Sequence, residues 1–294
     1  MKKTIALTGW ILLSLIVGAQ ASTPLGESQP RNFVLFFEIL DYTKEMGDAV
    51  SFFFTRVLEP GDQLIIYTPA RVYGFSKATL SKPKRDLVLT MQDHLRADTA
   101  ACSSNYKIIM NDMKIQARDI ENSETGSSDG QAGLKSSLNM YRQNLANLQS
   151  LRKVNETLLS QIVNMYKTQQ GKNHMVMVYQ TEFRPIPNKD TLNRLRAIPV
   201  ISFEVSELFV GEDQKPPLNA GGFIDAFQEV PITLHFLYIK PKDVSMFQDF
   251  KEHSSDMYSV FSQIAKATGG IVETTASPEA ALKTLVQALS ASVK

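Results

Sequence analysis

Cysteine is nearly missing from this sequence, which has Cys102 as its single example among 294 residues. One thiol cannot form a disulfide within the chain, even in an oxidising compartment. A lone cysteine can instead be a nucleophile or an intermolecular crosslink. The neighbours of Cys102 are alanines and serines. This context favours a small packing residue on a helix.

Long hydrophobic runs are also scarce. The one extended run, Ile5–Val17, has about 13 residues, whereas a membrane-spanning helix needs about 20. Two lysines precede it and Ala19-Gln20-Ala21 follows it, which is the pattern of a cleavable secretory signal. We therefore predict a signal peptide over residues 1–21, export to the periplasm or the medium, and no stable membrane insertion of the mature chain. An uncleaved N-terminal anchor is the alternative.

The sequence has no excess of either charge. It holds 31 basic and 30 acidic residues, a net charge of +1. The predicted signal peptide contains two of the lysines and none of the acids, so the mature chain has 29 against 30 and a net charge of −1. Such a balance gives no electrostatic reason to expect a nucleic acid or an anionic membrane as the partner.

Catalytic motifs are missing as well. The four histidines include no pair at metal-ligand spacing, and neither a GxSxG elbow nor a Walker-type glycine loop is present. His174 opens a predicted strand and His235 lies within another, so we interpret both as structural histidines. Glu38 and Asp41 could serve as an acid pair, but 30 acids produce such pairs by chance. We predict that the protein is not an enzyme.

The pattern of apolar and polar residues divides the sequence into three regions with different predicted secondary structure. After a linker over 22–31, residues 32–82 read as α/β, 83–170 as long helices, and 171–294 as α/β again. The apolar runs that predict buried strands are Phe33–Phe37, Gln63–Thr68, Ala70–Phe75, His174–Tyr179, Ile232–Ile239 and Gly270–Thr274. The expected fold class is therefore α/β, with a doubly wound and mostly parallel sheet.

The middle region has the most regular pattern in the sequence. From Leu134 to Leu151 apolar residues repeat at alternating steps of four and three, and the stripe continues to Met165. This spacing predicts a long helix packed on a partner helix. We expect a helical-hairpin insertion whose two arms bury their stripes on each other, with homodimerisation through the same stripe as the alternative. Ile198–Phe209 fits either an edge strand or a short helix.

The order of these elements resembles a von Willebrand factor A (VWA) domain, in particular the divergent VWA-like domains of exported bacterial proteins. The resemblance is carried by the opening strand with Asp41–Met46 after it, by Val57–Tyr67, and by Ile264–Glu273 near the end. It covers residues 32–82 and 172–294, and the helical region lies outside it. It implies a Rossmann-like doubly wound sheet, often with a divalent ion at the carboxyl ends of the strands.

The metal motif of that family begins with an aspartate followed by two serines at alternate positions. The matching positions here are Asp41, Thr43 and Glu45. The aspartate that the family places at the end of the fourth strand is matched by Gln180 or Thr181. Two of five elements are plausible, so the resemblance implies a degenerate metal site at Asp41 and Thr43. These two residues are also good N-cap residues for the next helix.

The expected function is that of a non-catalytic VWA-like module that binds or assembles envelope proteins. Its partner would be an unknown envelope or extracellular protein, with no nucleic acid and no cofactor. The alternative is a metal-dependent adhesion domain in which Asp41 and Thr43 hold Mg²⁺ or Ca²⁺ for an acidic ligand. The two readings differ in whether Asp41→Ala abolishes partner binding.

Overall fold

The computed structural model describes residues 31–124, 127–151, 156–211, 220–240 and 249–291, and the predicted signal peptide lies outside them. Its centre is a six-stranded sheet in the order β3-β2-β1-β4-β6-β8. The strands are β1 (Arg31–Glu38), β2 (Gln63–Tyr67), β3 (Val72–Phe75), β4 (Lys172–Gln180), β6 (Ile232–Ile239) and β8 (Val272–Thr275). β3 pairs antiparallel with β2, and every other pairing in this sheet is parallel.

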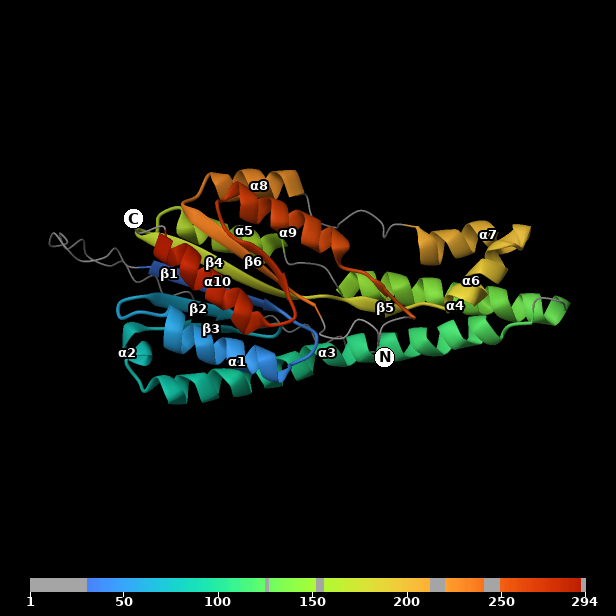
Figure 1. Cartoon of the computed structure of the whole chain (residues 1–294), viewed down its shortest axis with the longest axis horizontal. Helices are drawn as coiled ribbons and strands as arrows, with labels where there is room; N and C mark the ends of the chain where they lie inside the picture. Colours follow the sequence, from blue (N-terminus) through green and yellow to red (C-terminus); the bar gives the residue numbers. More distant parts are fainter. Residues whose placement is uncertain (1–30, 125–126, 152–155, 212–219, 241–248, 292–294) are drawn as a thin grey trace, which may run out of the picture.

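The central strands are buried on both faces, which explains their unbroken apolar runs. Alternate residues of β1 point to opposite sides, so Phe33 and Leu35 enter one core and Val34 and Phe36 enter the other. The first core is covered by α1 (Lys44–Phe52), the short π-helix η1 (Phe53–Val57), the beginning of α3 (Lys84–Asn122) and α10 (Pro278–Ala291). The second is covered by α5 (Glu156–Tyr166), α8 (Ala220–Gln228) and α9 (Ser255–Ala267) (Figure 1).

Helices on both faces of a mostly parallel sheet confirm the predicted α/β class and the doubly wound sheet. β1 pairs with β2 on one side and with β4 on the other. The chain therefore leaves β1 in one direction and later returns to its opposite side. This is the topological switch point of an open α/β sheet, where ligands bind beyond the carboxyl ends of the strands. Among the described residues, no helix is both long and apolar enough to span a membrane.

A helical arm extends beyond the carboxyl ends of the strands (Figure 1). We use this name for the second half of α3 from Tyr106, together with α4 (Ser128–Leu151), α6 (Lys189–Arg196), α7 (Pro199–Val205) and η2 (Ser206–Val210). The arm has its own core, which includes Met113, Leu138 and Leu195. α3 and α4 pack on each other as expected for a hairpin, and α6, α7 and η2 complete their core. The segment Ile198–Phe209 is therefore helical.

The predicted apolar stripe divides between two cores. Leu134, Leu138 and Leu148 of α4 are buried in the arm, whereas Ile162 of α5 is buried against the sheet. α3 divides in the same way, since Leu95 packs on the sheet and Met113 does not. The helical region is thus part insertion and part cover of the sheet.

Three short elements complete the described part of the chain. α2 (Lys77–Leu80) follows β3, and β5 (Phe183–Pro185) pairs antiparallel with β7 (Phe250–Glu252) beside the main sheet. Cys102 lies on α3 as expected, but its side chain is exposed, so the prediction of a packing role was wrong. The alanine and serine context cannot distinguish the exposed side of a helix from a closely packed one.

The turn from α9 into β8 requires glycine at two successive positions. Gly269 has a φ of 72°, the left-handed conformation that ends many helices. A Cβ on Gly270 would lie 1.7 Å from the carbonyl oxygen of Leu234, so only glycine allows this close approach of the backbone to β6.

Candidate functional site

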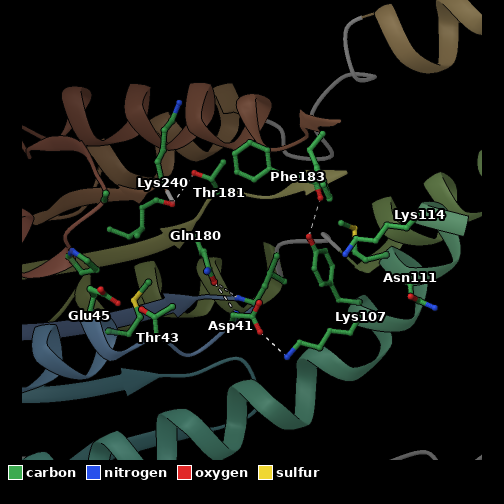
Figure 2. A pocket seen from close by; sticks show the side chains of 18 residues that line it. Asp41, Thr43, Glu45, Lys107, Asn111, Lys114, Gln180, Thr181, Phe183 and Lys240 are labelled. Atoms are coloured by element: carbon green, nitrogen blue, oxygen red, sulfur yellow. Dashed lines mark hydrogen bonds and ion pairs between the residues drawn. The ribbon is translucent and has the colours of Figure 1, made fainter. Parts of the chain in front are cut away.

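A cavity of about 630 Å³ lies beyond the carboxyl ends of the strands, at the switch point between β1 and β4. Figure 2 shows its lining from the sheet side and from the helical arm. The sheet side supplies the loop after β1, the ends of β4 and β6, and the turn before α10. The opposite wall is formed by three successive turns of α3. Their lining residues are Tyr106, Lys107, Met110, Asn111 and Lys114. The cavity therefore exists only because the arm crosses the edge of the sheet.

The loop after β1 is held by a side chain from β4. The amide oxygen of Gln180 accepts hydrogen bonds from the backbone N–H groups of Leu40 at 2.8 Å and of Asp41 at 2.9 Å. Because β1 and β4 are adjacent and parallel, Gln180 reaches the first two residues of this loop. The amide replaces the partners that these N–H groups would otherwise find in water.

Asp41 forms an ion pair with the arm. Its carboxylate lies 2.8 Å from the ammonium group of Lys107, and both side chains are more than half exposed. Thr43 is the N-cap residue of α1, but its side chain makes no capping hydrogen bond. Asp41, Thr43 and Glu45 all line the cavity, so the structure brings these candidate residues together with Gln180 and Thr181.

These residues do not fit a resident divalent cation as they stand. A positive ammonium group lies against the one aspartate of the motif, and the amide oxygen of Gln180 already accepts two hydrogen bonds. Over the described residues, no group of three or more histidine, cysteine, aspartate or glutamate side chains is placed to hold a metal. Metal binding by Asp41 and Thr43 stays a prediction that calorimetric titration with Mg²⁺, Ca²⁺ and Mn²⁺ tests.

The α3 wall combines positive charge with apolar surface. The hydroxyl group of Tyr106 donates a hydrogen bond to the backbone oxygen of Phe183 at 3.2 Å, which ties the arm to the chain after β4. The ammonium group of Lys114 lies 5.6 Å from the ring centroid of Phe250. Met110 lines the cavity between them. Lys107 and Lys114 were not predicted from the sequence, although their spacing of seven residues places them on one helical face.

A buried polar cluster supports the sheet side of the cavity. The hydroxyl group of Tyr179 donates a hydrogen bond of 2.5 Å to the buried carboxylate of Glu182. The backbone N–H of Glu182 donates to the hydroxyl oxygen of Ser254 at 3.0 Å. Burial, and then the charge of Glu182, raise the pKa of Glu38 to about 7. Glu38 lies at the end of β1, outside the cavity lining, and is a proton-binding group near neutral pH.

Two histidines that lie far apart in the sequence meet near the opposite end of the sheet. Nδ1 of His174 and Nε2 of His235 are 3.2 Å apart, and Nδ1 of His235 accepts a hydrogen bond from the N–H of Ile271 at 3.3 Å. That bond assigns the proton of His235 to Nε2, which donates to His174. Desolvation by burial is the main cause that lowers the pKa of His174 to about 4 and that of His235 to about 3.

The comparisons with known proteins add little to this geometry. No protein-family model and no curated protein matches the chain. One solved structure, the N-terminal domain of TFIIH p34, is similar at 9% identity and a TM-score of 0.29, covering 88% of this chain and 97% of that one. A score this low carries no argument. The fold assignment therefore rests on the strand order and the helix layers themselves.

Proposed function

We propose that this protein is a non-catalytic, VWA-like binding module that recognises a protein partner through the cavity between its sheet and its helical arm. The observation that supports it best is the position of the cavity at the switch point of the sheet. Open α/β sheets bind their ligands there because loops from both halves converge. The antiparallel strand β3 at the edge of an otherwise parallel sheet is common in doubly wound α/β folds.

The chemistry of the lining favours binding over catalysis. Asp41 forms an ion pair with Lys107. Much of the remaining lining is apolar, from Leu40, Met110, Phe183 and others. Apolar walls with a few well-placed polar groups are typical of recognition sites.

A cavity-filling substitution tests this proposal. Met110→Trp introduces an indole into the cavity from α3, and Met140→Trp introduces the same group at an exposed position of α4 outside it. A partner that copurifies with the wild-type chain from its native envelope should be lost with Met110→Trp and retained with Met140→Trp. Circular dichroism must show that both variants are folded. Equal recovery of the partner with both variants would contradict the proposal.

Export and homodimerisation are separate proposals. Export rests on the lysines, the apolar run and the small residues of positions 1–21. The intact mass of the protein recovered from the periplasm or the medium should lack these 21 residues. Dimerisation through the α4 stripe would compete with the packing of Leu138 and Tyr141 inside the arm, and sedimentation velocity over a range of concentrations measures it.

A further inference from the structure

Two lysines of α3 line the cavity, and only one of them, Lys107, forms an ion pair with a described residue. The Lys107 ammonium pairs with Asp41 at 2.8 Å. Lys114, two helical turns further on, has its ammonium group 5.6 Å from the ring centroid of Phe250, and no carboxylate in the described part of the chain lies within ion-pair distance of it. Figure 2 shows both side chains reaching from α3 to the cavity. Of the three lysines that line the cavity, Lys107 and Lys240 are therefore paired with the carboxylates of Asp41 and Glu252, and Lys114 is not paired with a described carboxylate.

The pair between Asp41 and Lys107 can be exchanged at little cost. Both side chains are more than half exposed, and ion pairs in such settings contribute little to stability. The pair also shows that a carboxylate can bind at this position beside the sheet. An incoming carboxylate can therefore contact Lys107 while Asp41 turns to water, and Lys114 lies two turns, about 10 Å, further along the same helical face.

Apolar groups surround these charges. Met110 lies between the two lysines in the sequence of α3, and Phe183 of β5 and Phe250 of β7 line the same cavity. An anionic ligand without apolar groups would leave this surface uncovered. A carboxylate beside a large apolar side chain matches both halves of the lining, because the apolar contact adds to a charge-assisted hydrogen bond.

We propose that the cavity binds an acidic side chain of a partner protein flanked by apolar residues, and that Lys107 and Lys114 supply the positive charge without a metal ion. This inference rests on the proposed function and names the chemistry of its partner. It also explains why the residues do not fit the metal motif: the ammonium group of Lys107 takes the position of the metal ion beside Asp41. The helical arm delivers an ammonium group to the place where a cation would approach Asp41.

The test uses the full mature chain, labelled with ¹⁵N, in buffer with EDTA. The probe is the blocked peptide acetyl-Leu-Asp-Phe-amide, and the matched probe has asparagine in place of aspartate. We expect saturable shifts of cavity resonances with the aspartate peptide at millimolar concentrations, and about tenfold weaker binding of the asparagine peptide. Acetate and inorganic phosphate, titrated separately, report whether a small anion alone is sufficient.

Charge-removing variants locate the binding. Lys114→Met should weaken binding of the aspartate peptide about tenfold, as should Lys107→Met. Lys135→Met, which removes an exposed lysine of α4 outside the cavity, should leave it unchanged. An effect of Lys135→Met equal to that of Lys114→Met would overturn the inference, because it would indicate nonspecific attraction.

Other outcomes separate this inference from the proposed function. Equal binding of the two peptides, no binding of the aspartate peptide, or phosphate binding as tight as that of the peptide would overturn the carboxylate assignment. Binding only after addition of Mg²⁺ or Ca²⁺ would overturn the metal-free assignment. In each of these cases a partner lost with Met110→Trp and retained with Met140→Trp would still support the proposed function. The proposed function is contradicted if the Met110→Trp variant retains its partner.

Discussion

The ion pairs at the two ends of the central sheet differ in their burial. Near the amino ends of the strands, the Arg31 guanidinium donates to both carboxylate oxygens of Asp62 at 3.1 and 2.7 Å. Nδ2 of Asn32 donates to the side-chain oxygen of Asn173 at 2.7 Å. At the carboxyl ends, Lys107 pairs with Asp41 across an exposed gap, and Lys114 faces a cavity.

This difference separates stabilising groups from binding groups. A buried polar group that has its partner within the chain contributes to folding, and the loss of that partner is expensive. An exposed charge beside a cavity contributes little to stability and is available to a ligand. We therefore expect substitutions near the amino ends to lower the free energy of unfolding, and substitutions at the cavity to change binding. The following predictions test this expectation, from the largest effect to the smallest.

Asp62→Ala should cause the largest loss of stability. Asp62 is 4% exposed, and it accepts hydrogen bonds from Arg31 and from the N–H of Glu59. Its removal leaves a mostly buried guanidinium without its carboxylate, and we expect a loss of about 3 kcal/mol in urea unfolding. Glu59→Ala is the control, because Glu59 is exposed and 3.4 Å from Arg31, so its loss should be within about 0.5 kcal/mol. Similar losses of stability for both variants would contradict the expectation that the buried partner of Arg31 stabilises the fold more than the exposed one.

The histidine pair should make the protein less stable in acid. In the unfolded chain both histidines bind protons below their ordinary pKa of 6.5, whereas in the folded protein they stay neutral down to about 4 and 3. The unfolded state therefore binds more protons, and the free energy of unfolding falls as the pH drops below 6.5, by up to about 3 kcal/mol for His174 at pH 4.

Urea unfolding of the wild-type chain and of His174→Asn between pH 4 and 7 measures this effect. The variant has one titrating group fewer, so the slope of its free energy of unfolding against pH should be smaller by about one proton. An unchanged slope would show that His174 is protonated in the folded protein.

Glu38→Gln should have the opposite dependence on pH. The folded protein holds the proton of Glu38 up to about pH 7, whereas the unfolded chain loses it near 4.5. Glu38 therefore destabilises the fold increasingly as the pH rises from 4.5 to 7, by up to about 3 kcal/mol. The glutamine variant should be more stable than the wild type at pH 8 in urea unfolding, with the gain disappearing at pH 4. A variant that is less stable at pH 8 would contradict this.

Gln180→Ala should have a smaller effect. It removes the acceptor for the N–H groups of Leu40 and Asp41, of which the second lies at an exposed position that water can reach. We expect a loss of about 1 kcal/mol. Hydrogen exchange should become faster at Leu40 and Asp41 and stay unchanged in β6.

Lys114→Met should have the smallest effect on stability, within about 0.5 kcal/mol, because Lys114 forms no ion pair with the described residues. The same variant should weaken binding of the aspartate peptide. A stability loss as large as that of Asp62→Ala would show that Lys114 belongs with the stabilising groups.

The strands and their layers could be predicted because burial on both faces leaves a direct signal. The run Phe33–Phe37 is apolar at every position, and the structure buries every one of these residues. The arm was predicted less completely. Its stripe indicates helices, but an apolar stripe can pack on another helix or on a sheet. Here Leu138 packs on the helices of the arm, whereas Ile162 packs on the sheet. Apolar spacing determines which face is buried and leaves the partner open.

The candidate site was predicted on one side only. Asp41, Thr43 and either Gln180 or Thr181 were named because the resemblance to a VWA domain places the ligands of its metal motif at the ends of these strands, and metal binding there stays a prediction. Lys107 and Lys114 were not found, since a lysine on a long helix is usually solvated. The histidine pair was missed for a related reason. His174 and His235 are 61 residues apart in sequence, and only the pairing of β4 with β6 brings them together.

By itself, the sequence determined the α/β class and the strands of the main sheet, because these depend on apolar periodicity and on short-range order. The loop after β1 was named as a polar site only through the family resemblance. The tertiary structure decided that α3 is long enough to cover the sheet with its first half and to cross the site with its second. The second half of α3 thereby places the ammonium group of Lys107 within ion-pair distance of Asp41. The physical reason is that a charge acts over a few ångströms in space, and only the folded chain defines which residues those are.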